Sequence, residues 1–133
     1  MGLLQFLASG ILSLMFASTT TLAVDQKPRI TGTFSNLQYV QESGDLLGYE
    51  LRILFTSRGY FAVVQVANGG AGSVALEAAN IAGQNVSIQL HDQPSGIVSL
   101  DGTIGAKWFE GIAKFDTGTK ERIKLARKKS YWD

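Results

Sequence analysis

The chain has 133 residues, no cysteine and a formal net charge of +1. The lack of cysteine excludes disulfide bonds and zinc sites built on thiolates, so the burial of apolar side chains must hold the fold together. A net charge so close to zero disfavours nucleic-acid binding, and the length suits one domain with a modest core.

The N-terminal residues differ from the rest because they carry no charged side chain and include an apolar stretch, Leu3–Phe16. They end at Thr21–Ala23, a small-x-small pattern typical of signal-peptide cleavage sites. We therefore predict a signal peptide at residues 1–23 and a secreted or periplasmic domain at residues 24–133, which meets a membrane only during export. An uncleaved anchor is the alternative, because no Lys or Arg precedes the apolar stretch, although the stretch is short for the about 20 residues that cross a bilayer.

From residue 30 onward, apolar residues recur mostly at every second position, and glycine-containing turns interrupt them at the spacing of antiparallel strands. The predicted strands are, in chain order, 30–40, 47–56, 60–67, 73–81, 85–90, 96–104, 108–115 and 119–127. Short links between them favour an all-β, single antiparallel eight-stranded up-and-down barrel, or a closely related sandwich, with a short basic and aromatic C-terminal tail.

Two turns fix the register of the strands on either side. A two-residue turn at Arg58 places alternate residues of strands 47–56 and 60–67 on one face, and a three-residue loop at 116–118 pairs Glu110 with Lys124. The residues predicted to form the core are Tyr49, Leu51, Ile53, Phe55, Val64, Val86, Ile88, Phe109, Ile123 and Leu125.

The tripeptide Gly32-Thr33-Phe34 in the first predicted strand is similar to the Gly-x-Trp opening of the lipocalins, with Phe34 in place of Trp. With the strand count, it gives the chain a resemblance to small barrels of the lipocalin and avidin type. The resemblance implies an apolar ligand held in the mouth of the barrel. Small inward residues could leave room for such a ligand or could fill a tight eight-stranded interior, and the residues expected to line the ligand site are Tyr49, Ala62, Gly111 and Ala113.

No constellation of residues indicates catalysis. The one histidine, His91, lies beside Asp92 in a predicted turn, and no serine lies in a Gly-x-Ser-x-Gly motif. The glycine-rich stretch 68–72 lacks the Lys-Ser/Thr of a phosphate-binding loop. We therefore expect a protein that is not an enzyme and that uses no cofactor and no metal.

Two surface features suggest partners. Basic residues gather at the C-terminal end, where they either protect a strand edge from unwanted pairing or bind an anionic envelope surface; they are Lys120, Arg122, Lys124, Arg127, Lys128 and Lys129. Leu54, Phe61 and Val63 form an outward apolar patch, which either a partner or a chain terminus, such as the tail Ser130–Asp133, would cover.

Two classes of function follow from these features. The first is a binding module for a small apolar ligand or an envelope component. The second is a protein-interaction module such as an inhibitor of a secreted hydrolase, because Gly105-Ala106-Lys107-Trp108 resembles a loop of barrel-type lysozyme inhibitors, without their cysteines.

Overall fold

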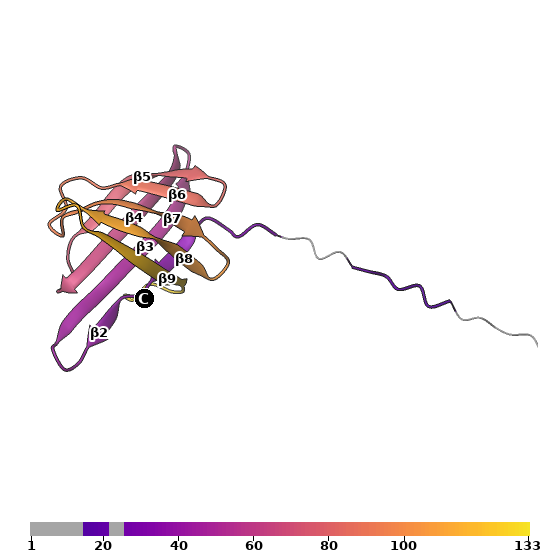
Figure 1. Ribbon diagram of the computed structural model, residues 1–133, viewed down its shortest axis with the longest axis horizontal. Helices are drawn as coiled ribbons and strands as arrows, with labels where there is room; N and C mark the ends of the chain where they lie inside the picture. Colours follow the sequence, from indigo (N-terminus) through magenta and orange to yellow (C-terminus); the bar gives the residue numbers. More distant parts are fainter. Residues whose placement is uncertain (1–14, 22–25) are drawn as a thin grey trace, which may run out of the picture.

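The computed structural model describes residues 15–21 and 26–133, so the predicted cleavage site and the first 14 residues lie outside the described part of the chain. The described residues contain no helix, and therefore none that is long and apolar enough to cross a membrane. They form one antiparallel sheet (Figure 1). Its strands are β1 (Gly32–Ser35), β2 (Gln38–Val40), β3 (Asp45–Thr56), β4 (Gly59–Gly69), β5 (Val74–Ala82), β6 (Asn85–Gln89), β7 (Ile97–Ile104), β8 (Trp108–Phe115) and β9 (Lys120–Arg127).

The sheet closes on itself through its first strand. β1 pairs with β3 on one side and with β9 on the other, while β3 to β9 follow one another as neighbours. β2 is an additional short strand that extends the sheet along the first residues of β3. The predicted all-β fold, an antiparallel eight-stranded barrel in up-and-down order, is confirmed.

The first predicted strand, 30–40, is wrong as a single strand because the chain bends at Asn36. The backbone N–H of Asn36 donates to the carbonyl of Tyr49 at 3.0 Å, and its side-chain Oδ1 accepts from the Tyr49 N–H at 2.6 Å. This contact needs a glycine opposite it, since a Cβ on Gly48 would lie 2.7 Å from the Asn36 carbonyl oxygen. The other predicted strands match the observed bounds within one or two residues.

The predicted registers are confirmed at both hairpins. Ile53 lies opposite Ala62 in the β3–β4 hairpin, and Glu110 lies opposite Lys124 in the β8–β9 hairpin. Alternation therefore directs the predicted apolar sets of these strands to the interior, where they belong to the main core cluster, while Leu37, Leu46 and Ala67 form a second, smaller cluster.

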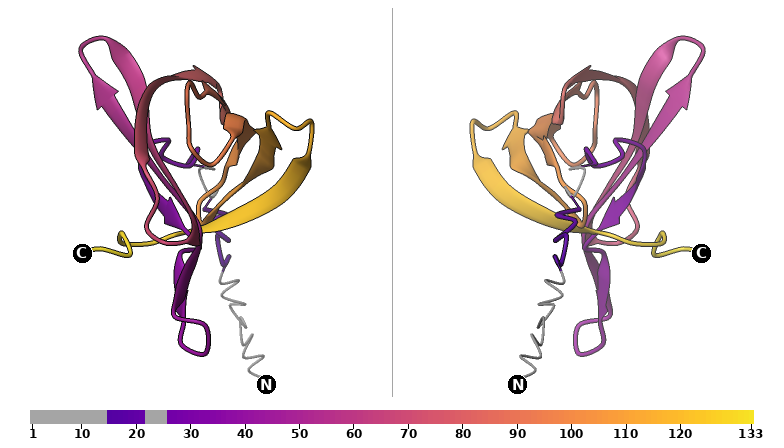
Figure 2. Two further views of the ribbon diagram at one scale, coloured as in Figure 1. Left: turned by 90° about the vertical axis from the view of Figure 1, so that its left-hand side faces the viewer. Right: turned by 90° about the vertical axis from the view of Figure 1, so that its right-hand side faces the viewer.

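The prediction is wrong for one core residue. Phe55 is 67% exposed, whereas every other predicted core residue is buried. The pairing of β1 with β3 reaches only Ile53, and the pairing of β5 with β4 reaches only Phe61, so the tip of the β3–β4 hairpin projects beyond the barrel (Figure 2). The ring of Phe55 packs there against Tyr60, with 4.9 Å between the ring centroids.

A pair of glycines makes room for the largest interior side chain. Gly102 and Gly111 lie opposite each other on β7 and β8. A Cβ on Gly102 or Gly111 would lie 2.6 or 2.8 Å from Cζ of Phe109, whose ring is completely buried. The space that the missing side chains leave is therefore occupied by this ring.

We expect Gly111→Ala to lower the free energy of unfolding by about 1 to 3 kcal/mol, the usual cost of overpacking a core. Gly105→Ala is the matched control, because the nearest atom to its added Cβ would lie 3.5 Å away, and the change should stay within about 0.5 kcal/mol. Urea denaturation of both variants measures the difference. Equal losses would contradict the packing of Phe109 against the glycine pair.

Candidate ligand-binding site at the barrel mouth

One end of the barrel is closed by Arg127 at the end of β9. Its guanidinium lies 4.5 Å from the centre of the Phe34 ring and donates hydrogen bonds to the carbonyls of Thr31 at 2.9 Å, Gly105 at 3.1 Å and Arg29 at 2.5 Å. Burial, with a smaller contribution from the charge of Arg29, lowers the pKa of Arg127. This side chain ties the segment before β1 to the β7–β8 turn.

The opposite end, which we call the mouth, carries the turns β2–β3, β4–β5, β6–β7 and β8–β9. A cavity of about 410 Å³ lies there and has both apolar and polar walls. Its lining residues are Asn36, Leu47, Gly48, Tyr49, Val66, Ala67, Asn68, Ser95, Phe115 and Glu121. A second cavity of about 400 Å³ shares Val66, Asn68 and Ser95 with the first, so the two adjoin.

A hydrogen bond between β3 and β9 defines the polar wall of the mouth cavity. The hydroxyl of Tyr49 donates to Oε2 of Glu121 at 2.6 Å. Tyr49 is only 7% exposed, and this burial raises its pKa far above the usual range, with further contributions from the hydrogen bond to Glu121 and from its negative charge. The phenol therefore stays a neutral donor, and Glu121 offers acceptor oxygens at the edge of the cavity.

The pKa of Tyr49 is higher in the folded state than in the unfolded chain. This residue therefore contributes stability that is fully present below about pH 10. The contribution is lost as the pH rises toward the pKa of the folded state. We expect the free energy of unfolding of the wild type to fall more steeply above about pH 10 than that of Tyr49→Phe. Denaturation at a series of alkaline pH values measures both slopes. Tyr39→Phe, which removes an exposed phenol, should keep the wild-type slope.

The structure separates the four residues that the sequence assigned to a ligand site. Tyr49 lines the mouth cavity, whereas Ala62 and Ala113 are completely buried in the core and Gly111 faces the ring of Phe109. Glu121, the partner of Tyr49, was not predicted as a site residue. The sequence does contain a signal for it, because the predicted β8–β9 register places this carboxylate on the inward face, opposite Ala113.

The basic residues divide between two faces of β9. Lys120, Arg122 and Lys124 are exposed on the outer face, and Lys124 lies 3.4 Å from Glu110 and 4.5 Å from the centre of the Trp108 ring. Lys128 and Lys129 follow the strand and are also exposed. Arg127 does not belong to this surface. Its odd-numbered position places it on the inward face of β9, and its side chain closes the far end of the barrel.

The C-terminal tail lies on the outer face of β3 and β4. Ser130 donates through Oγ to the carboxylate of Glu50, and the backbone N–H of Tyr131 donates to the same carboxylate at 2.8 Å. The indole of Trp132 donates to Gln65 at 2.8 Å. Glu50 and Gln65 are each only 8% exposed, although their strand positions face outward, because the tail covers them.

The predicted apolar patch adjoins this tail. Leu54, Val63 and Trp132 line a cavity of about 310 Å³, so the tail covers one margin of the patch. Leu54 remains 42% exposed, and Phe61 is partly buried. The patch continues onto β5 through the exposed Leu76, which lies opposite Val63.

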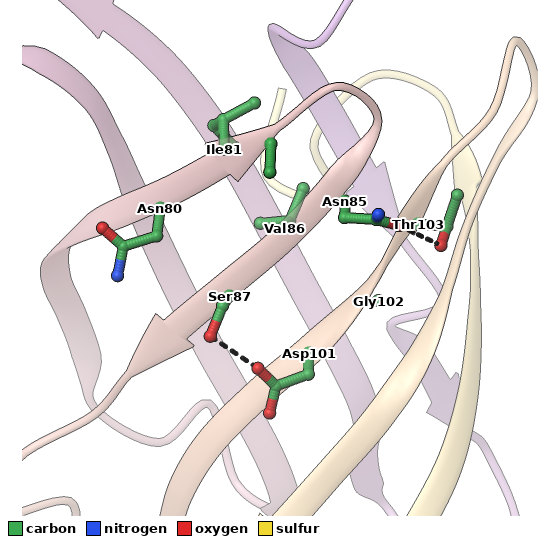
Figure 3. Close-up of a pocket in the computed structure, with 9 residues that line it drawn as sticks. Asn80, Ile81, Asn85, Val86, Ser87, Asp101, Gly102 and Thr103 are labelled. Atoms are coloured by element: carbon green, nitrogen blue, oxygen red, sulfur yellow. Dashed lines mark hydrogen bonds between the residues drawn. The ribbon is translucent and has the colours of Figure 1, made fainter.

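A further depression, of about 570 Å³, lies on the outer wall formed by β5, β6 and β7 (Figure 3). Ser87 donates to Asp101 at 2.6 Å, and Thr103 donates to Asn85 at 3.1 Å. Much of its polar lining is therefore hydrogen-bonded internally. The mouth cavity is smaller but more enclosed, and it is the better candidate for a ligand site.

Comparisons with known protein families, curated proteins and solved structures found no match. Among the residues that the structure describes, no group of three or more His, Asp or Glu side chains is placed to hold a metal ion.

Proposed function

We propose that this protein is a non-catalytic binding module that holds a small amphipathic ligand in its mouth. The observation that carries the proposal is the asymmetry of the barrel: Arg127 closes one end, and the other opens into a cavity next to the partly buried Tyr49–Glu121 hydrogen bond. Its volume of about 410 Å³ falls within the range of about 300 to 1,000 Å³ found for small-molecule sites.

The lining supports a ligand with an apolar body and a hydrogen-bond donor. Leu47, Val66 and Phe115 offer apolar contact, and burying the ligand against them supplies affinity in proportion to the area removed from water. The carboxylate of Glu121 accepts from Tyr49 and has further lone pairs for a donor group of the ligand. Export of the domain after removal of residues 1–23 is part of this proposal and rests on the apolar, uncharged N-terminal sequence.

The experiment uses the fluorescence of N-phenylnaphthylamine, an apolar probe with a single N–H donor. Ser95 is exposed and lines both mouth cavities, so Ser95→Trp should fill them without disturbing the core. We expect this variant to bind the probe at least about tenfold more weakly than the wild type.

Ser57→Trp is the matched control, because Ser57 is an exposed turn residue at the opposite end of the barrel, and its probe affinity should be unchanged. Native mass spectrometry of protein purified from its source complements this test by showing whether a small molecule is retained. Equal probe binding by both variants, or no binding by the wild type, would overturn the proposal.

A further inference from the structure

The wall of the barrel is open along part of β9. On the side away from β8, the pairing of β9 with β1 covers only Ala126 and Arg127. β1 leaves this edge after Ser35, where Asn36 turns to bond Tyr49 on β3. Figure 2 shows β9 and β3 splaying apart from there toward the β8–β9 turn.

The backbone of Lys120, Arg122 and Lys124 faces this opening. Odd-numbered residues of β9 and its flanks form the backbone hydrogen bonds with β8. The carbonyl of Thr119 accepts from the N–H of Phe115, and the N–H of Arg127 donates to the carbonyl of Lys107. Lys128 N–H bonds to Thr33 O, so even-numbered positions face the other way. In the part of the chain that the structure describes, no backbone partner occupies the edge from Lys120 to Lys124.

The side chains along this edge decide what can pair with it. Lys120, Arg122 and Lys124 point outward from it, and Lys120 lies opposite another cation, Lys114, on β8. Of the three, only Lys124 has a carboxylate within salt-bridge distance among the described residues. A second copy of this edge would set these cations against each other, which disfavours self-association. An acidic strand would be attracted instead.

The inward side of the same edge has a different character. Ile123 is 6% exposed, and Glu121 forms part of the mouth cavity. A strand added to this edge would place alternate side chains against the cations outside and against these two residues inside, because side chains alternate across a sheet. The residue opposite Ile123 should be apolar, and the one opposite Glu121 should carry a donor such as a hydroxyl.

We propose that the edge Lys120–Lys124 binds an extended peptide segment of a partner protein by strand addition, with acidic residues at alternate positions. The segment would continue the path of β1, antiparallel to β9, and its main-chain groups would bond to Lys120, Arg122 and Lys124. The pattern that fits is acidic, apolar, acidic, hydroxyl, acidic. This inference does not rest on the small-molecule proposal, which concerns the interior of the mouth.

The test uses a fluorescent peptide containing Glu-Val-Glu-Thr-Glu and measures its affinity by anisotropy. N-methylation of the central Glu removes an N–H that would donate to β9. N-methylation of the Thr removes an N–H that would point away from β9. We expect the first change to weaken binding by about tenfold or more and the second to have little effect. In NMR hydrogen exchange, the peptide should protect the amides of Arg122 and Lys124.

Arg122→Pro removes the edge donor without removing a β8–β9 hydrogen bond, a position at which strands tolerate proline. It should weaken binding more than Arg122→Gln, which removes the charge and keeps the amide. A peptide with Lys in place of Glu should not bind. Strand addition would be overturned if the two N-methylated peptides bound with equal affinity. It would also be overturned if the protein bound anionic vesicles as strongly as the peptide and with the same salt dependence, because both results would show attraction by charge alone. Absence of binding by the unmodified peptide would overturn it too.

Discussion

Ile53→Ala is expected to lower the free energy of unfolding by about 2 to 5 kcal/mol, the usual cost of truncating a buried aliphatic side chain. Ile53 is 1% exposed and belongs to the interior cluster of the barrel. The loss has two sources. The truncated side chain buries fewer apolar groups on folding, and the truncation leaves a cavity that neighbouring side chains fill only partly.

Ile112→Ala is the matched control, since it makes the same chemical change on the outer face of β8, where the side chain is 37% exposed. We expect it to cost less than about 1 kcal/mol. Urea denaturation of both variants measures the two losses. A larger loss for the outer residue would mean that the inward and outward faces are exchanged.

Arg127→Met is expected to lower the free energy of unfolding by about 2 to 4 kcal/mol, because the guanidinium makes several charge-assisted hydrogen bonds to backbone carbonyls. Methionine keeps an unbranched apolar side chain but has no charge, so the variant removes the hydrogen bonds and the contact of the guanidinium with the Phe34 ring together. Their loss leaves the carbonyl of Gly105 without its side-chain donor, whereas the carbonyl of Thr31 keeps a weaker bond from Nε of Arg29 at 3.2 Å.

The control is Arg122→Met, an exposed position on the same strand, which should change the free energy of unfolding by no more than about 0.5 kcal/mol. Hydrogen exchange provides a second measurement. If Arg127 closes the barrel end, the amide of Lys128, which bonds to Thr33, should exchange faster in Arg127→Met than in the control. Equal stability of the two variants would show that Arg127 has no closing role.

The sequence by itself determined seven of the eight predicted strands, the strand order and most of the core. These are local or pairwise properties: alternation sets which face of a strand is apolar, and a short turn fixes the register of the two strands it joins. The pairing of Glu110 with Lys124 follows from one three-residue loop and was predicted correctly. The core positions of Ile53 and Ile88 follow from alternation alone.

The tertiary structure decided the features that depend on where strands stop and which distant residues meet. Alternation places Phe55 on the same face of β3 as the core residues, but its side chain is exposed because no neighbouring strand reaches the tip of the hairpin. Arg127 reads as one more cation of a basic run, yet closure of the barrel brings it over Phe34. Glu121 meets Tyr49, 72 positions away in sequence, because closure of the sheet brings β9 near β3. Alternation carries no information about strand ends or about contacts between residues far apart in sequence, so the closed end, the mouth and the open edge arise from the closure of the sheet.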